Sequence, residues 1–222
     1  MPRSFTILLI SANQFEQPYP VYPLAVSYLS AWLGEKIPAA RTGIFDLRGH
    51  SLEDLCAHIR STSPDYIGIS LRNVDDTNIY ADNSFVSGYA AIVAAIRTET
   101  KSPVIVGGAG YSIFPVDLFD AIGADYGIVG EGEAALAELI ETLERSGDPA
   151  GQERVICRRN GRIVQGASGS TIASPVLSFD SALLPSYWSS SGMLNIQTKR
   201  GCPHRCIYCT YPLIDGRKVR TV

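Results

Sequence analysis

The chain has 222 residues, a formal net charge of -3 at pH 7 and 45% hydrophobic residues. This length accommodates one full domain and part of a second, and the apolar content is sufficient for a sizeable core. Because there is no basic excess, nucleic-acid binding is not expected as the main function. The N-terminal apolar run is too short for a secretory signal, and no segment approaches a membrane span. We therefore expect a cytoplasmic protein whose thiols stay reduced.

The chain up to residue 143 predicts five strands that alternate with five helices. Each predicted strand is a short apolar run bounded by turn residues, which is typical of a strand buried in a parallel sheet. Ser51 is a plausible N-cap, with Asp54 three residues later. The predicted strands cover 5–11, 41–47, 65–71, 102–108 and 124–130, and the helices cover 22–34, 51–60, 85–100, 115–122 and 130–143. Alternation of this kind predicts an α/β fold, a five-stranded doubly wound parallel sheet with right-handed crossovers.

The character of the sequence changes after residue 146. ERVICRRNGRIVQG predicts a hairpin that turns at Asn160-Gly161, and residues 167–192 are rich in Ser, Gly and Pro, as in a linker. Residues 193–199 predict a new strand that leads into a cysteine-rich loop. We therefore divide the chain into a sheet domain, a hairpin with its linker, and the start of a further domain, at residues 1–148, 149–190 and 191–222.

The loop TKRGCPHRCIYCTYP contains three of the five cysteines, Cys202, Cys206 and Cys209, in C-x3-C-x2-C spacing. Zinc sites usually have four ligands, and His204, placed between two cysteines, would strain the loop as the fourth. Iron–sulfur clusters normally have four thiolates, so three would leave one iron open, as a catalytic centre requires. A small zinc site or a chance grouping remains the alternative.

This loop resembles the C-x3-C-x-aromatic-C signature of radical S-adenosylmethionine (SAM) enzymes, with Tyr208 at the aromatic position. Arg200-Gly201 and Pro203 are also similar to that family. The resemblance implies a [4Fe–4S] cluster held by the three cysteines, with SAM at the fourth iron and Tyr208 near the adenine. It also implies a one-electron reductant of the flavodoxin or ferredoxin type, and a 5'-deoxyadenosyl radical that abstracts hydrogen from an unactivated carbon.

The carboxyl ends of the predicted strands are where such a sheet binds ligands. Neither G-x-G-x-x-G after the first strand nor G-x-x-x-x-G-K-[ST] occurs, so nicotinamide and nucleoside triphosphate lack their motifs. Glu131 and Glu133, at a helix N-terminus, make that end a poor phosphate site. The candidate contacts at the strand ends are Asn13, Ser70, Leu71, Arg72, Asn73, Gly107, Gly108, Ala109, Gly110, Tyr111, Gly130, Glu131 and Gly132.

The order SLRN, VGGAG and DYGIVGEGE, followed by the cysteine loop, resembles one class of radical SAM enzymes. In that class a cobalamin-binding Rossmann-type domain, flavodoxin-like in fold, precedes the (β/α) barrel. The resemblance covers nearly the whole chain and implies that the strand-end residues contact cobalamin. Other cobalamin proteins carry D-x-H-x-x-G after the first strand, where this chain reads SANQF without a histidine. We therefore expect a displaced dimethylbenzimidazole tail and no histidine on cobalt. Arg72 is expected to face the lower side of the corrin, and an ion pair with Asp75 or Asp76 is the alternative.

Together, the two resemblances imply methylation of an unactivated carbon of a small-molecule or peptide substrate, with methylcobalamin as methyl donor. Rearrangement, cyclisation, a scaffold domain that has lost cobalamin, and a non-catalytic cobalamin- or metal-binding fragment remain alternatives. A methylthiotransferase would need three more cysteines in the first domain, where only Cys56 and Cys157 are present. Because a barrel needs more strands than follow the cysteine loop, we expect this chain alone to bind cobalamin, hold its cluster poorly and show no turnover.

Overall fold

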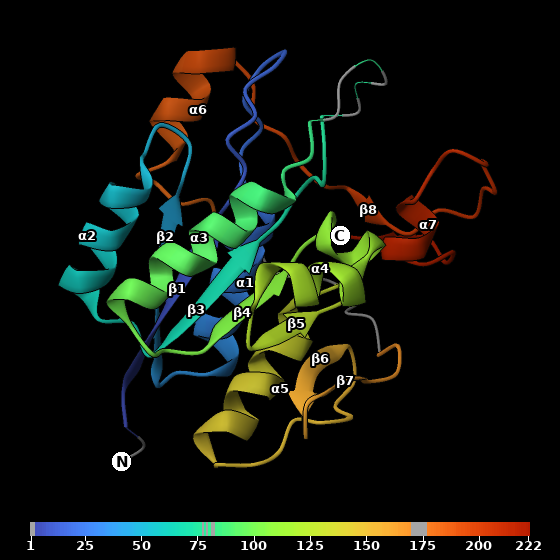
Figure 1. Cartoon of the computed structure of the whole chain (residues 1–222). Helices are drawn as coiled ribbons and strands as arrows, with labels where there is room; N and C mark the ends of the chain where they lie inside the picture. Colours follow the sequence, from blue (N-terminus) through green and yellow to red (C-terminus); the bar gives the residue numbers. More distant parts are fainter. Residues whose placement is uncertain (1–2, 77, 79, 81–82, 170–176) are drawn as a thin grey trace.

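The computed structural model describes residues 3–76, 78, 80, 83–169 and 177–222. One sheet runs through it in the order β2-β1-β3-β4-β5-β6-β7 (Figure 1). The first five strands are parallel, whereas β6 and β7 are antiparallel additions at the β5 edge. The strands are β1 (Phe5–Ser11), β2 (Ala40–Asp46), β3 (Tyr66–Ser70), β4 (Val104–Gly107), β5 (Tyr126–Ile128), β6 (Val155–Arg159) and β7 (Arg162–Gln165). The predicted parallel sheet is confirmed, and the order 2-1-3-4-5 is the flavodoxin-like one.

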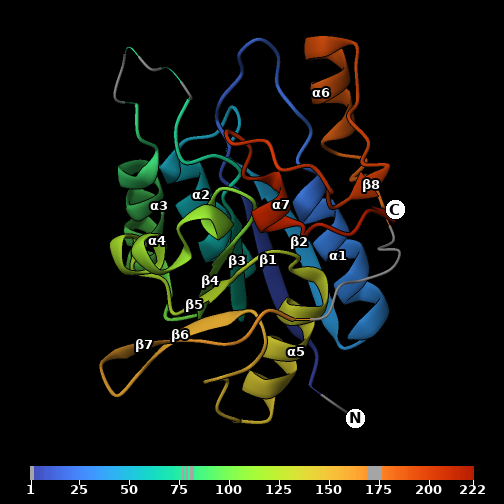
Figure 2. The same cartoon turned by 90° about the vertical axis from the view of Figure 1, so that its right-hand side faces the viewer.

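Helices cover both faces of this sheet, as expected of a doubly wound fold. Figures 1 and 2 show α2, α3 and α4 on one face and α1 and α5 on the other. The helices are α1 (Leu24–Lys36), α2 (Leu52–Thr62), α3 (Val86–Glu99), α4 (Pro115–Ile122), α5 (Glu133–Glu144), α6 (Leu184–Ser191) and α7 (Tyr211–Ile214), with a 3-10 turn at Tyr111–Ile113. None of the helices in the described part of the chain is long and apolar enough to span a bilayer.

Strand β1 divides its apolar side chains between the two layers of the core. Leu8 and Ile10 pack with α2, α3 and α4, whereas Ile7 and Leu9 pack with α1 and α5. Successive side chains of a strand point to opposite faces, so a continuous apolar run is what a strand with helices on both faces requires. Strands β1 and β3 are parallel neighbours in the sheet although not in sequence, so their carboxyl ends meet at one edge.

The start of α2 confirms the predicted cap. The hydroxyl of Ser51 accepts a hydrogen bond from the Asp54 amide at 3.1 Å, and the Asp54 carboxylate accepts one from the Ser51 amide at 2.8 Å. These reciprocal bonds form a capping box, which satisfies two amides that the helix itself leaves unpaired.

Three features after residue 146 differ from the sequence-based expectations. The hairpin turns as predicted, but it continues the sheet because β6 pairs with β5. The predicted linker contains α6, whose Tyr187 donates a hydrogen bond to Asp46 at 2.6 Å. The strand predicted over residues 193–199 is wrong over most of its length. Only β8 (Lys199–Arg200) forms, paired with β9 (Arg220–Thr221), because residues 193–198 have no neighbouring strand to pair with in the described structure.

Candidate functional site

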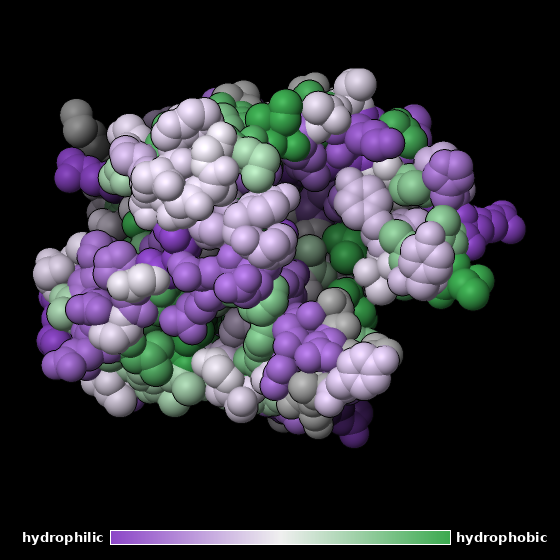
Figure 3. Space-filling view, turned by 90° about the horizontal axis from the view of Figure 1, so that it is seen from above, coloured by the Kyte–Doolittle hydropathy of each residue, from purple (hydrophilic) through white to green (hydrophobic). Residues whose placement is uncertain are grey.

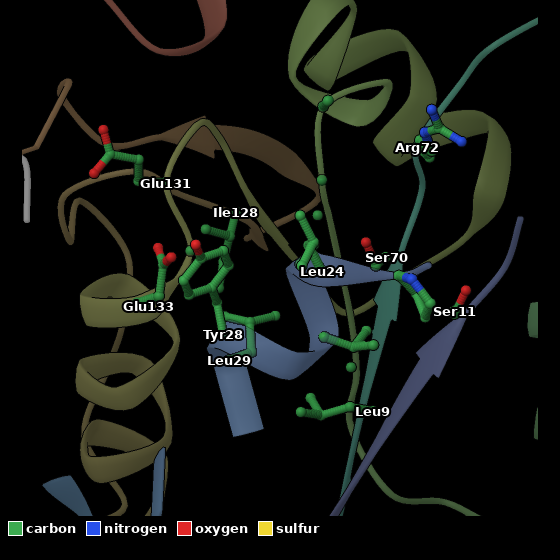
Figure 4. A pocket seen from close by; sticks show the side chains of 18 of the residues that line it. Leu9, Ser11, Leu24, Tyr28, Leu29, Ser70, Arg72, Ile128, Glu131 and Glu133 are labelled. Atoms are coloured by element: carbon green, nitrogen blue, oxygen red, sulfur yellow. The ribbon is translucent and has the colours of Figure 1, made fainter. Parts of the chain in front are cut away.

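A cavity of about 360 Å³ lies at the carboxyl edge of the parallel sheet. Its floor is apolar and includes Leu9, Ile105 and Ile128, while Leu24 and Leu29 approach from α1. In Figure 4 the polar side chains divide, with Ser11, Ser70 and Arg72 on one side and Glu131 and Glu133 on the other. Figure 3 shows this end of the molecule hollowed, with hydrophobic side chains deep in the recess. An apolar floor with a few polar groups at the rim is typical of a site for an organic ligand.

Most of the predicted strand-end contacts meet in this cavity although they are far apart in sequence. The predicted contacts that line it are Asn13, Ser70, Arg72, Gly107, Gly108, Ala109, Gly130, Glu131 and Gly132. They come from the ends of β1, β3, β4 and β5, which parallel strands bring to one edge.

Four of the predicted contacts are not placed in the cavity wall. Leu71 and Tyr111 are buried in the core, at 1% and 0% exposure, and Tyr111 points into the space above Gly127. Gly110 packs against the backbone of Asn73, which a Cβ atom at Gly110 would meet at 2.8 Å. Leu71, Asn73, Gly110 and Tyr111 therefore support the loops and do not line the cavity.

The glycine loop after β4 is pinned to the loop after β3. The Leu71 amide donates to the Gly107 carbonyl at 2.8 Å, and the Gly110 amide donates to the Leu71 carbonyl at 3.0 Å. Gly108 has φ +103°, and a Cβ there would lie 2.6 Å from the Leu71 oxygen. Only glycine accommodates both this dihedral angle and this close approach.

Ser112 ties the same loop to the loop after β5. Its hydroxyl donates to the Gly108 carbonyl and accepts from the Gly130 amide, both at 2.8 Å. Two walls of the cavity are therefore joined through one buried hydroxyl. Ser112 carries no signal of this role in its local sequence, because its partner Gly130 follows a different strand.

One wall of the cavity is built by the segment that carries the cysteine loop. Asn195, Gln197, Arg200 and Asp215 line the cavity together with the sheet residues. The Asn195 side chain donates to the Tyr22 carbonyl at 3.2 Å, so this segment is attached to the loop before α1. None of the four was predicted to line the cavity, since nothing in their local pattern indicates a partner in the first domain.

A buried ionic network joins that wall to the start of α5. Arg200 forms ion pairs with Glu131 and Glu133, and Arg220 forms one with Glu131. Burial lowers the pKa of Arg200, but the two glutamates outweigh this effect, so its pKa is raised. Burial raises the pKa of Asp215, which lies in the same wall. Because both glutamates have buried arginine partners, they do not form an open site for a further ion.

The three cysteines of the C-x3-C-x2-C loop lie at the surface beside this wall. Cys202 is half-buried, whereas Cys206 and Cys209 are exposed, and Tyr208 is 87% exposed. The loop is held at its base, where the Cys202 amide donates to the Gly216 carbonyl at 3.0 Å. Within the described ranges, no three His, Cys, Asp or Glu side chains are grouped so that they could hold a single metal ion.

Comparison with known proteins identifies the sheet domain. A family model described as "B12 binding domain" matches residues 15–140. The tryptophan 2-C-methyltransferase of Streptomyces laurentii is 33% identical over 147 residues, which are 64% of this chain and 24% of that protein.

Solved structures agree with this assignment. The radical SAM methyltransferase TsrM from Kitasatospora setae, solved with cobalamin and a [4Fe-4S] cluster, superposes with a TM-score of 0.86 at 25% identity. This match covers 98% of this chain and 43% of that one. The cobalamin-dependent radical enzyme OxsB gives a TM-score of 0.79 at 20% identity, over 99% of this chain and 30% of that one, and this likeness shows the fold. The chain thus spans less than half the length of each relative. With its flavodoxin-like strand order, its cavity at the strand ends and the matched residues 15–140, the chain belongs to the B12-binding domain family.

Proposed function

We propose that this chain is the cobalamin-binding part, and the first piece of the catalytic part, of a radical SAM methyltransferase that acts on an unactivated carbon. The single observation that carries the proposal is the composition of the cavity wall. Strand-end residues such as Ser70 and Arg72 face the same cavity as Asn195 and Arg200, which lead into the cysteine loop. A cofactor on the sheet and a cofactor on that loop would therefore share one space.

The residues around the cavity fit cobalamin. The apolar floor between the sheet and α1 suits an aromatic group, and the glycines at the ends of β4 and β5 leave their backbone groups open to close approach. Among the described residues that line the cavity there is no histidine. We propose that cobalamin binds there with its own base displaced and without a histidine on cobalt.

The cysteine loop suits an iron–sulfur cluster better than a single ion. Each thiolate of such a cluster binds a different iron, so the thiols need not converge on one point. Exposed Cys206 and Cys209 and half-buried Cys202 supply three thiolates, and Tyr208 is exposed beside them. When bound, the cluster with SAM supplies one-electron radical chemistry and cobalamin supplies a methyl carrier.

The chain's own residues would bind and orient these groups. The backbone of Gly107 and Gly108 would support the cofactor from the sheet, and Tyr28 and Leu29 would exclude water from the α1 side. Arg72 lines the cavity and is exposed. We propose that its fixed positive charge disfavours a ligand on the lower face of cobalt. The substrate, a small molecule or a peptide, and the reductant would be met by the complete protein.

Retention of cobalamin is the experiment that tests the sheet domain. The chain is expressed anaerobically, incubated with hydroxocobalamin and desalted, and its absorbance spectrum is recorded. We expect bound cobalamin with a base-off spectrum. A folded protein that emerges colourless would overturn cobalamin binding and favour a scaffold or docking role.

The variant Arg72→Ala tests the lower-face assignment in the same assay. We expect cobalamin to be retained with a spectrum shifted toward lower-face coordination. The matched control is Arg60→Ala, which removes an arginine from the surface of α2, where it pairs with Glu99 at 2.8 Å. An Arg72→Ala spectrum identical to the wild-type one would remove this role from Arg72.

A further inference from the structure

The acidic pair at the start of α5 and two arginines that flank the cysteine loop form one buried cluster. The side chains of Glu131 and Glu133 are each 4% exposed, and those of Arg200 and Arg220 are 7% and 11% exposed. Arg220 Nη1 donates to Glu131 Oε2 at 3.0 Å, and Arg200 Nη1 donates to the same oxygen at 3.4 Å. One carboxylate is thus shared by two guanidinium groups.

The arginines have further partners that hold their orientation. Arg200 Nε donates to Gln197 Oε1 at 3.1 Å, and its guanidinium lies 5.2 Å from the centre of the Tyr28 ring. Arg220 Nη2 donates to the Asp215 carbonyl at 3.1 Å. Burial of the phenol, which outweighs the nearby Arg200 charge, raises the pKa of Tyr28. Contacts from α1, α5 and the cysteine-loop segment therefore converge on these two side chains.

The backbone ladder at the base of the loop is very short. Only two residue pairs form it, Lys199 with Thr221 and Arg200 with Arg220. An isolated two-stranded ladder of this length is not stable by itself in water. In addition, Arg200 and Arg220 stand directly opposite each other, and like charges in this position destabilise a strand pair.

Glu131 resolves this conflict, since its carboxylate accepts from both arginines. Breaking a buried ion pair by removing one partner is costly, because the remaining charge stays buried without compensation. Glu131 also lines the cavity, together with Arg200 and Asp215. The same carboxylate is therefore part of the cavity wall and the closure of the cysteine loop.

We propose that Glu131 is a positioning residue that couples the two cofactor sites. By bridging Arg200 and Arg220 it closes the β8–β9 ladder and sets where the cysteine loop stands against the cavity. The identity of the two ligands rests on the proposed function, whereas the bridge itself rests on the contacts above. Occupancy of the cavity then stabilises the loop, and loss of the bridge uncouples them.

Amide hydrogen exchange on this chain, with and without hydroxocobalamin, tests the coupling. In Glu131→Gln we expect exchange of peptides within 199–221 to become about tenfold faster, while β1 and β3 peptides stay unchanged. In the wild type, hydroxocobalamin should slow exchange in 199–221; in Glu131→Gln it should slow exchange only in the sheet loops. This ligand-dependent difference is a readout that a merely structural role would not move.

Controls make each result decisive. Glu141→Gln changes an exposed glutamate of the same helix, paired with Arg145 at 3.0 Å, and should leave exchange in 199–221 at the wild-type rate. Arg220→Gln removes one of the two arginines that Glu131 bridges, and this residue lies outside the seven-stranded sheet. Because this change also removes the like charge opposite Arg200, we expect a smaller increase in exchange than in Glu131→Gln, and we expect the double variant to be no faster than Glu131→Gln alone.

The outcomes separate the two proposals. Wild-type exchange rates in Glu131→Gln, or fully additive effects with Arg220→Gln, would overturn the bridge. If the wild type does not retain hydroxocobalamin, the proposed function fails, whereas the bridge is still judged by the exchange rates without ligand. If the wild type retains it but the loop does not respond, the coupling is overturned and cobalamin binding stands.

Discussion

At the scale of single residues, the glycines at the end of β4 show how a close backbone approach limits the sequence. Gly108 has a positive φ and lies against the Leu71 backbone, which cannot move aside as a flexible side chain could. Gly49 also has a positive φ, of +76°, but a Cβ there meets nothing within 4 Å. The two positions therefore separate the cost of the dihedral angle from the cost of close packing.

We expect Gly49→Ala to lower the free energy of unfolding by about 1 kcal/mol, because only the left-handed conformation is strained. Gly108→Ala should lower it by about 3 kcal/mol, because the clash with Leu71 adds to the strain. Urea unfolding measures both values. Cobalamin retention should be lost only in Gly108→Ala, and equal losses in the two variants would contradict a role for this close approach.

At the scale of elements, the capping box of α2 is a local signal that the sequence carries in full. Hydrogen bonds from the Ser51 backbone and side chain lower the pKa of Asp54 below its ordinary value of 3.8. A carboxyl whose pKa is depressed on folding stabilises the folded state above its unfolded-state pKa. This contribution is lost as the pH falls through the lower, folded-state pKa.

We therefore expect Ser51→Ala to lower the free energy of unfolding by about 1 kcal/mol. Asp54→Asn should be less stable than the wild type at neutral pH, and the difference should disappear as the pH falls below 3.8 toward the folded-state pKa. Thermal unfolding across this pH range measures it. Glu53→Gln, in the same first turn, is the control for the helix-dipole effect alone. A difference between wild type and Asp54→Asn that is constant with pH would contradict the assignment.

The C-terminal elements form by contacts with distant parts of the chain. Tyr187 of α6 bonds to Asp46 at the end of β2, and Arg48 donates to Ser186 and Ser190 of α6, each at 2.8 Å. Such pairs leave no periodic signal in a Ser-rich segment. This is why a linker was predicted where a helix packs.

At the scale of the whole molecule, the cysteine loop and the sheet domain meet at one cavity, which makes the loop's chemistry testable. After anaerobic reconstitution with iron and sulfide, we expect iron and acid-labile sulfide to be bound in less than stoichiometric amount, because this chain alone is expected to hold its cluster poorly. Cys202→Ala, Cys206→Ala or Cys209→Ala should each lose most of both. Cys56→Ala should bind as the wild type does, since Cys56 lies on α2. Zinc bound without sulfide, or iron content insensitive to the three changes, would contradict the cluster.

The local part of this protein could be predicted from its sequence. Apolar runs bounded by turn residues predicted the five parallel strands, Ser51 and Asp54 predicted the cap, and the strand ends predicted part of the cavity lining. Each of these depends on residues close together in the chain, or on the general rule that parallel strands end at one edge.

The tertiary structure alone decided the rest, because it depends on residues that are far apart in sequence. Gly127 leaves room for Tyr111, which therefore enters the core instead of the cavity. Arg200 and Arg220 reach Glu131 across more than 60 residues, and this proximity, rather than any motif, places the cysteine loop beside the cavity at the strand ends. Sequence patterns determined which chemical groups are present, whereas packing determined which of them share a site.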